Sequence, residues 1–177
     1  MKNKSSNPKE YLFVDGYNII NDWGKLKALS QINLEQARNE LIDIMTEYQH
    51  YSGIKVIIVF DAHYVKNNSG KKDNIKGVDI VYTKENETAD QYIERTLDAI
   101  GRLKKVRVAT SDWMEQQVIL GRGGTRISAR ELEAEIQDER RLVINKRKEN
   151  NKINDVIIGR LDEETLKKLE KWGKNTE

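Results

Sequence analysis

Short apolar segments rich in β-branched residues alternate along this chain with longer segments of helical periodicity, and no other feature limits the possible folds as strongly. Four short segments have the length and composition of β-strands: residues 11–14, 54–60, 78–82 and 105–109. Between them, apolar residues recur every three or four positions, notably over residues 34–48 and 89–100, as in amphipathic helices. Because strands that alternate with helices join through right-handed crossovers, the pattern predicts an α/β fold: a parallel sheet with helices on both faces.

The C-terminal part of the chain is predicted to be mainly helical. A short fifth strand is expected after the glycine-rich segment 121–125, so the sheet should contain four to five strands. Ser128 and Glu131 have the spacing of a capping box, which predicts a long helix from Ser128, and a last helix is expected near residues 162–172. We therefore divide the chain into a disordered leader, a domain and a C-terminal helical tail, with a softer boundary near residue 127: residues 1–10, 11–148 and 149–177.

The amino-acid composition excludes several classes of function for this protein. The chain contains no Cys, which excludes disulfides, thiolate zinc sites and a Cys nucleophile, and its two His leave little scope for a Ser-His-Asp triad. Charged residues make up 34% of the chain, and no apolar run approaches the roughly 20 residues of a membrane helix, so we expect a soluble, cytoplasmic protein. The 31 basic and 29 acidic residues nearly balance, so the net charge does not indicate what the protein binds. Only the distribution of the charged residues along the chain can do so. Carboxylate and metal chemistry becomes the leading class.

Acidic residues lie at or just beyond the ends of the predicted strands. Asp15 and Asp61 directly follow two strands, whereas Asp90 and Asp112 lie beyond the other two, at expected helix starts. In an open parallel sheet the carboxyl ends of the strands share one edge, where ligands bind. We therefore expect these carboxylates, joined by Glu87, to form a site for Mg²⁺ or Mn²⁺, which prefer oxygen ligands and relieve repulsion between clustered acids.

The acids also have structural interpretations. Asp15 begins an ordinary turn signal. Asp90 and Asp112 lie where acids favour a helix N-terminus, and Thr88 opens a capping box ahead of Asp90. Capping does not explain why Asp15 and Asp61 close two strands, so the shared site is the preferred interpretation.

The segment after the first strand, Asp15-Gly-Tyr-Asn18, adds detail to this site. Gly16 permits the close approach of a ligand or of backbone, and the Asn18 amide could accept a hydrogen bond from a metal-bound water or orient a phosphate. A phosphatase that forms an aspartyl-phosphate is the competing interpretation. That scheme usually needs a second acid two residues later, where this chain has Tyr17.

Five short motifs occur in a fixed order along the chain: Tyr11–Asn18, Val59–Asp61, Glu87–Asp90, Thr110–Asp112 and Ile127–Leu132. Over residues 11–148 they resemble the motifs of the NYN family of PIN-like nucleases, in particular its YacP-type bacterial branch. The resemblance implies a PIN-like three-layer α/β/α fold and divalent-metal endoribonuclease activity. For this branch it also implies association with ribosomes and cleavage of mRNA during translation.

Residue by residue, the resemblance implies that Asp15, Asp90 and Asp112 are metal-site acids and that Asn18 is their companion polar group. Asp61 and Glu87 match less securely, because many PIN-like nucleases place an acid elsewhere between the first two strands. The predicted reaction is hydrolysis of an RNA phosphodiester by metal-activated water. A non-catalytic RNA- or ribosome-binding adaptor and a tRNA-directed nuclease are the alternatives, and the adaptor is disfavoured because every acid position is filled.

RNA binding requires positive charge and flat side chains around such an acidic centre. The candidate RNA-binding cations flank two loops: Lys71, Lys72, Arg122, Arg126 and Arg130. Lys66 belongs to the first of these loops. Trp23 and Trp113 are candidates for base stacking, although an aromatic side chain is more often part of the core. The basic end of the long helix, within residues 140–152, could contact ribosomal RNA, with a solvated helix face as the simpler alternative.

Overall fold

The structure, a computed structural model, describes Pro8 and residues 10–64, 70–100, 104–112, 118–160 and 167. It divides into two compact units, residues 1–139 and 140–177. The first unit contains the sheet, and the described part of the second continues the long helix α6 (Ala129–Arg160). Most of the predicted leader and of the helix near residues 162–172 lies outside the described residues, so the domain boundaries at 11 and 148 stay predictions.

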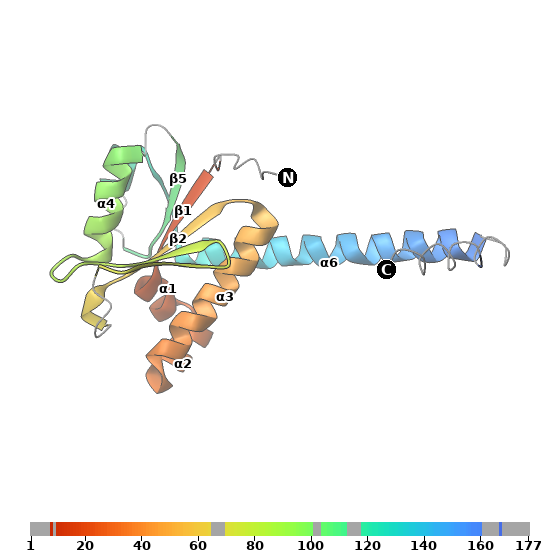
Figure 1. Ribbon diagram of the computed structural model, residues 1–177, viewed down its shortest axis with the longest axis horizontal. Coiled ribbons are helices and arrows are strands. Elements are labelled where there is room, and N and C mark those ends of the chain that lie inside the picture. Colours follow the sequence, from red (N-terminus) through yellow and green to blue (C-terminus); the bar gives the residue numbers. More distant parts are fainter. Residues whose placement is uncertain are drawn as a thin grey trace. The chain divides into compact units, whose positions relative to one another are not determined.

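A central sheet of six strands, in the spatial order β3-β4-β2-β1-β5-β6, confirms the predicted α/β class. Five strands run parallel: β1 (Glu10–Asp15), β2 (Lys55–Phe60), β4 (Val78–Tyr82), β5 (Lys105–Ala109) and β6 (Thr125–Ile127). The apolar strands β1 and β2 lie at the centre, and the near-continuous hydrophobicity of residues 54–60 predicts this position for β2. Their carboxyl ends therefore meet at one edge of the sheet (Figure 1).

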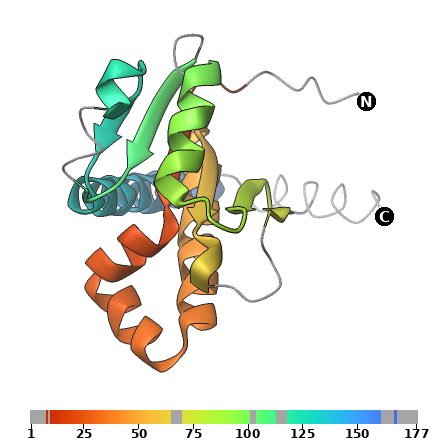
Figure 2. The same ribbon diagram turned by 90° about the vertical axis from the view of Figure 1, so that its left-hand side faces the viewer.

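Helices cover both faces of the sheet (Figures 1 and 2). Alternate residues of the strands, such as Leu12 and Ile58, pack in one apolar cluster with α1 (Gly16–Asp22), α2 (Gly24–Ile32), α3 (Leu34–Ser52) and the start of α6. The opposite residues, such as Phe13 and Val81, pack in a second cluster with α4 (Ala89–Ile100). The three-layer prediction is confirmed, and none of the helices in the described part of the chain has the length and apolar character needed to span a membrane.

The sixth strand, β3 (Lys72–Ile75), was not predicted, so the expected count of four to five strands is too low. All four of its residues are exposed, and the sequence shows no apolar alternation there. It pairs antiparallel with β4 across a two-residue turn, in which Lys76 and Gly77 have φ values of 50° and 94°. Positive φ at both turn positions suits the twist of a tight hairpin. Lys71 and Lys72, which were predicted to flank a polar loop, therefore lie at the start of an edge strand.

Helix α6 is joined to the sheet by a polar network on the α3 face. The guanidinium of Arg107 in β5 donates to both carboxylate oxygens of Glu135, at 2.8 and 3.0 Å. Tyr48 of α3 also donates its hydroxyl to Glu135 and accepts from Arg107 at 3.1 Å. Three elements distant in sequence are thereby fixed to one another. The Ser128–Glu131 capping box at the start of α6 is confirmed as well, with Glu131 N–H donating to Ser128 Oγ at 3.2 Å.

Candidate active site

Asp15 ends β1 and caps the helix that follows it. Its Oδ1 accepts a hydrogen bond from the backbone N–H of Asn18 at 3.2 Å, in the first turn of α1. A carbon added at Gly16 would meet the Phe60 ring at 2.3 Å, so glycine is needed where α1 leaves the sheet. Asp15 shares the α4 face with Phe13, since side chains two residues apart on a strand point to the same side.

The carboxyl group of Asp15 is strongly perturbed. Burial raises its pKa from the ordinary 3.8 to about 7, against the backbone hydrogen bond from Asn18, which lowers it. The negative charge of Asp90, a hydrogen bond with the Asp90 side chain, and the charge of Asp61 raise the pKa further. Asp15 therefore lies within electrostatic range of two other predicted acids, Asp90 and Asp61, and its ionised form is disfavoured when no cation is bound.

Asp90 lies in the first turn of α4, but other residues cap that helix. Thr88 and Gln91 form a reciprocal capping box, with hydrogen bonds of 3.1 and 3.2 Å. The cap predicted from the sequence is therefore present, and it leaves the Asp90 carboxyl group to face Asp15.

Asp61 follows β2 and accepts a hydrogen bond from the backbone N–H of His63 at 2.9 Å. This bond begins the short 3-10 helix η1 (Ala62–Tyr64), whose His63 is exposed. Asp61 thus has a local structural role and also adds negative charge next to Asp15 and Tyr17.

Asp112 lies beyond β5, the strand next to β1. Its backbone N–H donates to Thr110 Oγ1 at 3.1 Å, and the preceding Ser111 N–H donates to Asn18 Oδ1 at 2.6 Å. Asn18 therefore ties α1 to the segment that carries Asp112. Sequence reasoning assigned Asn18 to a water or a phosphate, whereas its carbonyl oxygen here holds a neighbouring loop at the site.

The predicted metal ligand Glu87 is engaged elsewhere. One of its carboxylate oxygens lies 2.8 Å from Arg95 of α4, and the other accepts from the backbone N–H of Lys84 at 3.2 Å. Both bonds stabilise the loop between β4 and α4. Its role as a metal ligand stays a prediction, and its contacts favour a structural role.

The donor chemistry of the acidic edge fits a hard divalent cation. Within the described ranges, no group of three or more His, Asp and Glu side chains is arranged to hold an ion. Mg²⁺, however, commonly takes only one or two carboxylates and completes its octahedron with water and substrate phosphate. Asp15 and Asp90 supply such a pair, and a bound cation would relieve the repulsion that raises the pKa of Asp15.

Arg38 of α3 is a cation at this edge that sequence reasoning missed. Its Nη1 donates to the Tyr17 hydroxyl at 3.1 Å, and its charge acts on the hydroxyls of both Tyr17 and Tyr82. The Phe60 ring lies between these two tyrosines, with ring centroids 5.2 and 5.7 Å away. The helical periodicity of residues 34–48 gave no signal for Arg38, because only the packing of α3 against α1 brings it to Tyr17, on which the charge of Asp61 also acts.

The predicted RNA-binding cations have different surroundings. Arg122 forms ion pairs with Asp98 and, at 3.4 Å, with Glu94, so it is committed to α4. Lys71 pairs with Asp73 at 3.2 Å. Arg126 is half-buried in β6, and its buried Nε has no hydrogen-bond partner among the described residues, whereas Arg130 is exposed in the first turn of α6.

The remaining candidates for RNA binding are two tryptophans and two lysines. Trp23 is a core residue whose indole N–H donates to the Ala129 carbonyl at 2.9 Å, so it does not stack on bases. Lys72 lies over the Tyr92 ring, with its Nζ 5.6 Å from the centroid. Lys66 and Trp113 lie outside the described residues.

A mostly parallel α/β sheet with carboxylates at its carboxyl edge is the architecture expected of an NYN-type protein. Residues 12–174 match the family described as YacP-like NYN domain. Since this match covers most of the chain, the protein belongs to that family, and the resemblance noted in the sequence is confirmed.

Relatives of the chain agree with this assignment. It is 46% identical over 165 residues to the uncharacterized protein YacP of Bacillus subtilis (strain 168), covering 92% of this chain and 96% of that protein. The crystal structure of Rae1 (YacP) from Bacillus subtilis matches with a TM-score of 0.69 and 43% identity, covering 93% of this chain and 94% of that one. A crystal structure of a mutant of the same Bacillus subtilis protein matches with a TM-score of 0.67 and 42% identity over 80% and 82% of the two chains. This relationship supports a nuclease-type, RNA-related function.

Proposed function

We propose that this protein is a metal-dependent endoribonuclease that hydrolyses RNA phosphodiester bonds, with mRNA on the ribosome as its substrate. The observation that carries the proposal is the burial of Asp15 against Asp90, with the pKa of Asp15 raised to about 7. A carboxyl group in this environment destabilises the native state when it ionises without a cation. Groups perturbed in this way by burial and a specific charged partner occur mainly at functional sites.

Asp15 and Asp90 would hold the cation, Mg²⁺ or Mn²⁺, while Asp61 and Asp112 flank them on the neighbouring strands. A divalent cation bound there lowers the pKa of water, polarises a phosphoryl oxygen and stabilises the leaving 3′-oxygen. Asp15, whose pKa is raised to about 7, would ionise more readily with a cation bound beside it. Asp61 and Asp112 orient the attacking water through their carboxylates.

Arg38 would bind the substrate phosphate next to these acids. Its guanidinium is half-buried and donates one bond to Tyr17 at 3.1 Å, which leaves further N–H groups for non-bridging phosphate oxygens. A fixed cation at this point offsets the repulsion between the acidic cluster and RNA.

A non-catalytic adaptor is the alternative from a different functional class. An adaptor binds RNA through cations and gains nothing from two half-buried carboxyl groups in contact, so the Asp15–Asp90 contact favours the enzyme. A tRNA-directed nuclease would use the same acids, and the positions of the cleaved ends distinguish it from an mRNA endonuclease.

The test is to incubate the purified full chain with translating ribosomes and with naked RNA, in Mg²⁺, Mn²⁺ or EDTA, and to map the ends. Cleavage should require the cation and disappear in Asp15→Asn and Asp90→Asn. The control Asp43→Asn removes an exposed carboxylate of α3 and should cleave normally. Cation-independent cleavage, or full activity in both site variants, would refute the proposed function.

A further inference from the structure

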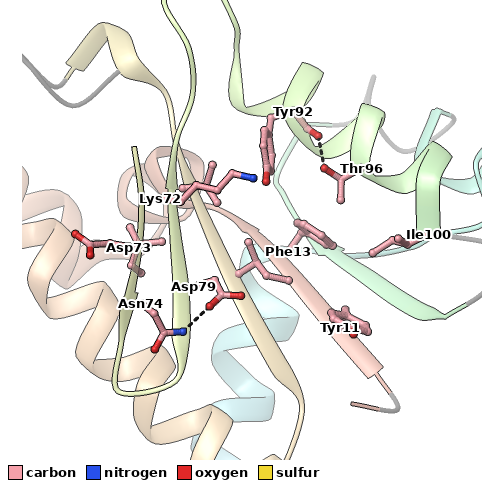
Figure 3. Close-up of a pocket in the computed structure, with 12 residues that line it drawn as sticks. Tyr11, Phe13, Lys72, Asp73, Asn74, Asp79, Tyr92, Thr96 and Ile100 are labelled. Carbon is pink, nitrogen blue, oxygen red and sulfur yellow. Dashed lines mark hydrogen bonds between the residues drawn. The ribbon is translucent and has the colours of Figure 1, made fainter. Parts of the chain in front are cut away.

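A cavity of about 510 Å³ lies between α4 and the strands β1, β2, β3 and β4, on the sheet face of the second apolar cluster (Figure 3). Its volume is within the range of sites that hold small organic ligands. The apolar part of its lining comes from the central strands and from α4: Tyr11, Phe13, Ile57, Val81, Tyr92 and Ile100. A flat, uncharged ring system is the kind of ligand group that such a lining accommodates.

The acids that line this cavity are already paired. Asp79 of β4 lies 2.9 Å from Lys55 Nζ. It also accepts a hydrogen bond from the Asn74 amide (Figure 3). Asp73 pairs with Lys71 at 3.2 Å. Their negative charges are therefore compensated, and the cavity does not repel an anionic ligand through them.

Tyr92 forms an aromatic wall between two cations. Lys72 extends from β3 toward the Tyr92 ring and places its Nζ 5.6 Å from the centroid (Figure 3). The Arg95 guanidinium lies 5.5 Å from the same centroid. Such a ring, fixed on a helix and accompanied by cations, is a platform on which a nucleobase can stack.

A second hollow of about 160 Å³ adjoins the cavity and shares Lys72, Val81 and Tyr92 with it. It adds Lys84 and Arg95, on the loop after β4 and on α4, toward the carboxyl edge of the sheet. Arg95 is neutralised by Glu87, which also lines this hollow, but neither Lys72 nor Lys84 forms an ion pair with a carboxylate in the described part of the chain. This end of the cavity therefore carries excess positive charge next to an apolar interior.

We infer that the cavity binds one nucleotide of the RNA strand, with its base against Tyr92 and the apolar floor and its phosphate at Lys72 and Lys84. The apolar interior matches the base of a nucleotide, and the cationic end matches its phosphate. Neither feature alone would indicate a nucleotide as the ligand. The inference rests on the proposed function for the identity of the strand. Asp90 and Tyr92 belong to the same end of α4, so a strand held at the acids has neighbouring nucleotides within reach of this cavity.

The direct test measures binding to the full chain in EDTA, where no cleavage is expected, by calorimetry with adenosine 5′-monophosphate, adenosine and inorganic phosphate. The monophosphate should bind more tightly than either part alone. Tyr92→Leu should weaken its binding about tenfold, in line with the loss of one base–aromatic stack, and Tyr92→Phe should preserve it. Lys72→Gln/Lys84→Gln should reduce monophosphate binding to the level of adenosine. The control Lys76→Gln, in the β3–β4 turn, should bind as the wild type does.

A short single-stranded RNA distinguishes a strand from a free nucleotide. The RNA should displace the monophosphate, and Lys72→Gln/Lys84→Gln should make its log affinity fall less steeply with log salt, by about 0.7 per lost phosphate contact. Absence of saturable monophosphate binding, or equal binding by Tyr92→Leu, Tyr92→Phe and wild type, would overturn the inference. Monophosphate binding without competition from RNA would also overturn it, in favour of a free-nucleotide site.

The cleavage assay separates failure of this inference from failure of the proposed function. Cleavage that needs Asp90 but has an unchanged KM in Tyr92→Leu would refute the nucleotide site and leave the enzyme intact. Nucleotide binding that depends on Tyr92 in a protein without cleavage activity would support this site and refute the enzyme.

Discussion

Asp15→Asn should stabilise the protein in the absence of divalent cations, and more strongly at higher pH. Burial and the Asp90 charge raise the pKa of Asp15 from 3.8 to about 7, so its ionised form is disfavoured in the folded state. A raised carboxyl pKa contributes stability that is complete below pH 3.8 and is lost as the pH rises through about 7. Asn is nearly isosteric, stays neutral and is itself a good N-cap, so it keeps the hydrogen bond to α1.

The magnitude follows from the two pKa values. With about 1.4 kcal/mol per pH unit of difference, ionisation of Asp15 costs the folded state about 4 kcal/mol at pH 8 and about 2 kcal/mol at pH 5. The melting temperature of Asp15→Asn should therefore exceed that of the wild type at pH 8 by about 8–16 °C, and by about half as much at pH 5. Millimolar Mg²⁺ should raise the wild-type melting temperature and leave that of Asp15→Asn almost unchanged.

The assay is a set of thermal melts between pH 5 and pH 8, in EDTA and in Mg²⁺. The control Asp43→Asn, an exposed position on α3, should stay within about 0.5 kcal/mol of the wild type throughout. A variant that melts below the wild type at pH 8, or that gains the same increment from Mg²⁺, would show that Asp15 is a capping residue without a site role.

Asp90→Asn should abolish cleavage without loss of folding, because Thr88 and Gln91 cap α4 independently; normal turnover measured by mapped RNA ends would contradict this. Arg38→Gln should lower RNA affinity and flatten its salt dependence by about 0.7 in log–log slope, whereas Arg122→Gln should leave that slope unchanged, because Arg122 is paired with α4. Glu135→Gln should lower the free energy of unfolding by about 1–3 kcal/mol in urea at pH 7, because the largely buried Arg107 loses one of its two carboxylate partners and keeps only Glu10. Arg107 holds the pKa of Glu135 below its ordinary value of 4.5, so this last loss should fade as the pH falls below that range.

The layer architecture and the position of the acids were predictable from the sequence because they depend on local patterns. Strands such as β2 are recognisable from a run of apolar, β-branched residues, and alternation with helices dictates parallel strands. Once the strands are parallel, Asp15 and Asp61 must lie at one edge, whatever the details of packing. The capping boxes at Thr88 and Ser128 were likewise readable, because each involves residues three apart.

Edge strand β3 and the partners of the charged side chains could not be predicted in this way. Residues 72–75 carry no apolar alternation, since none of them is buried, and they form a strand only because β4 offers an unpaired edge. The glycine-rich segment predicts Arg122 as an RNA contact, and its sequence gives no sign that α4 presents Glu94 and Asp98 to it. The partner of a long charged side chain is set by whichever element lies within its reach, and sequence separation carries no information about that.

The sequence by itself determined that Asp15 and Asp61 reach the carboxyl edge, and the tertiary structure decided the surroundings of their carboxyl groups and which other side chains join them. The pKa of Asp15 depends on how much solvent the packing of α1 and α4 removes and on how closely Asp90 approaches it. Arg38, 23 residues beyond Asp15, joins the edge only through the packing of α3 against α1. Desolvation and Coulomb energies depend on distances in space. A sequence pattern predicts the order of the helices and strands, but these energies are set only when the helices and strands pack together.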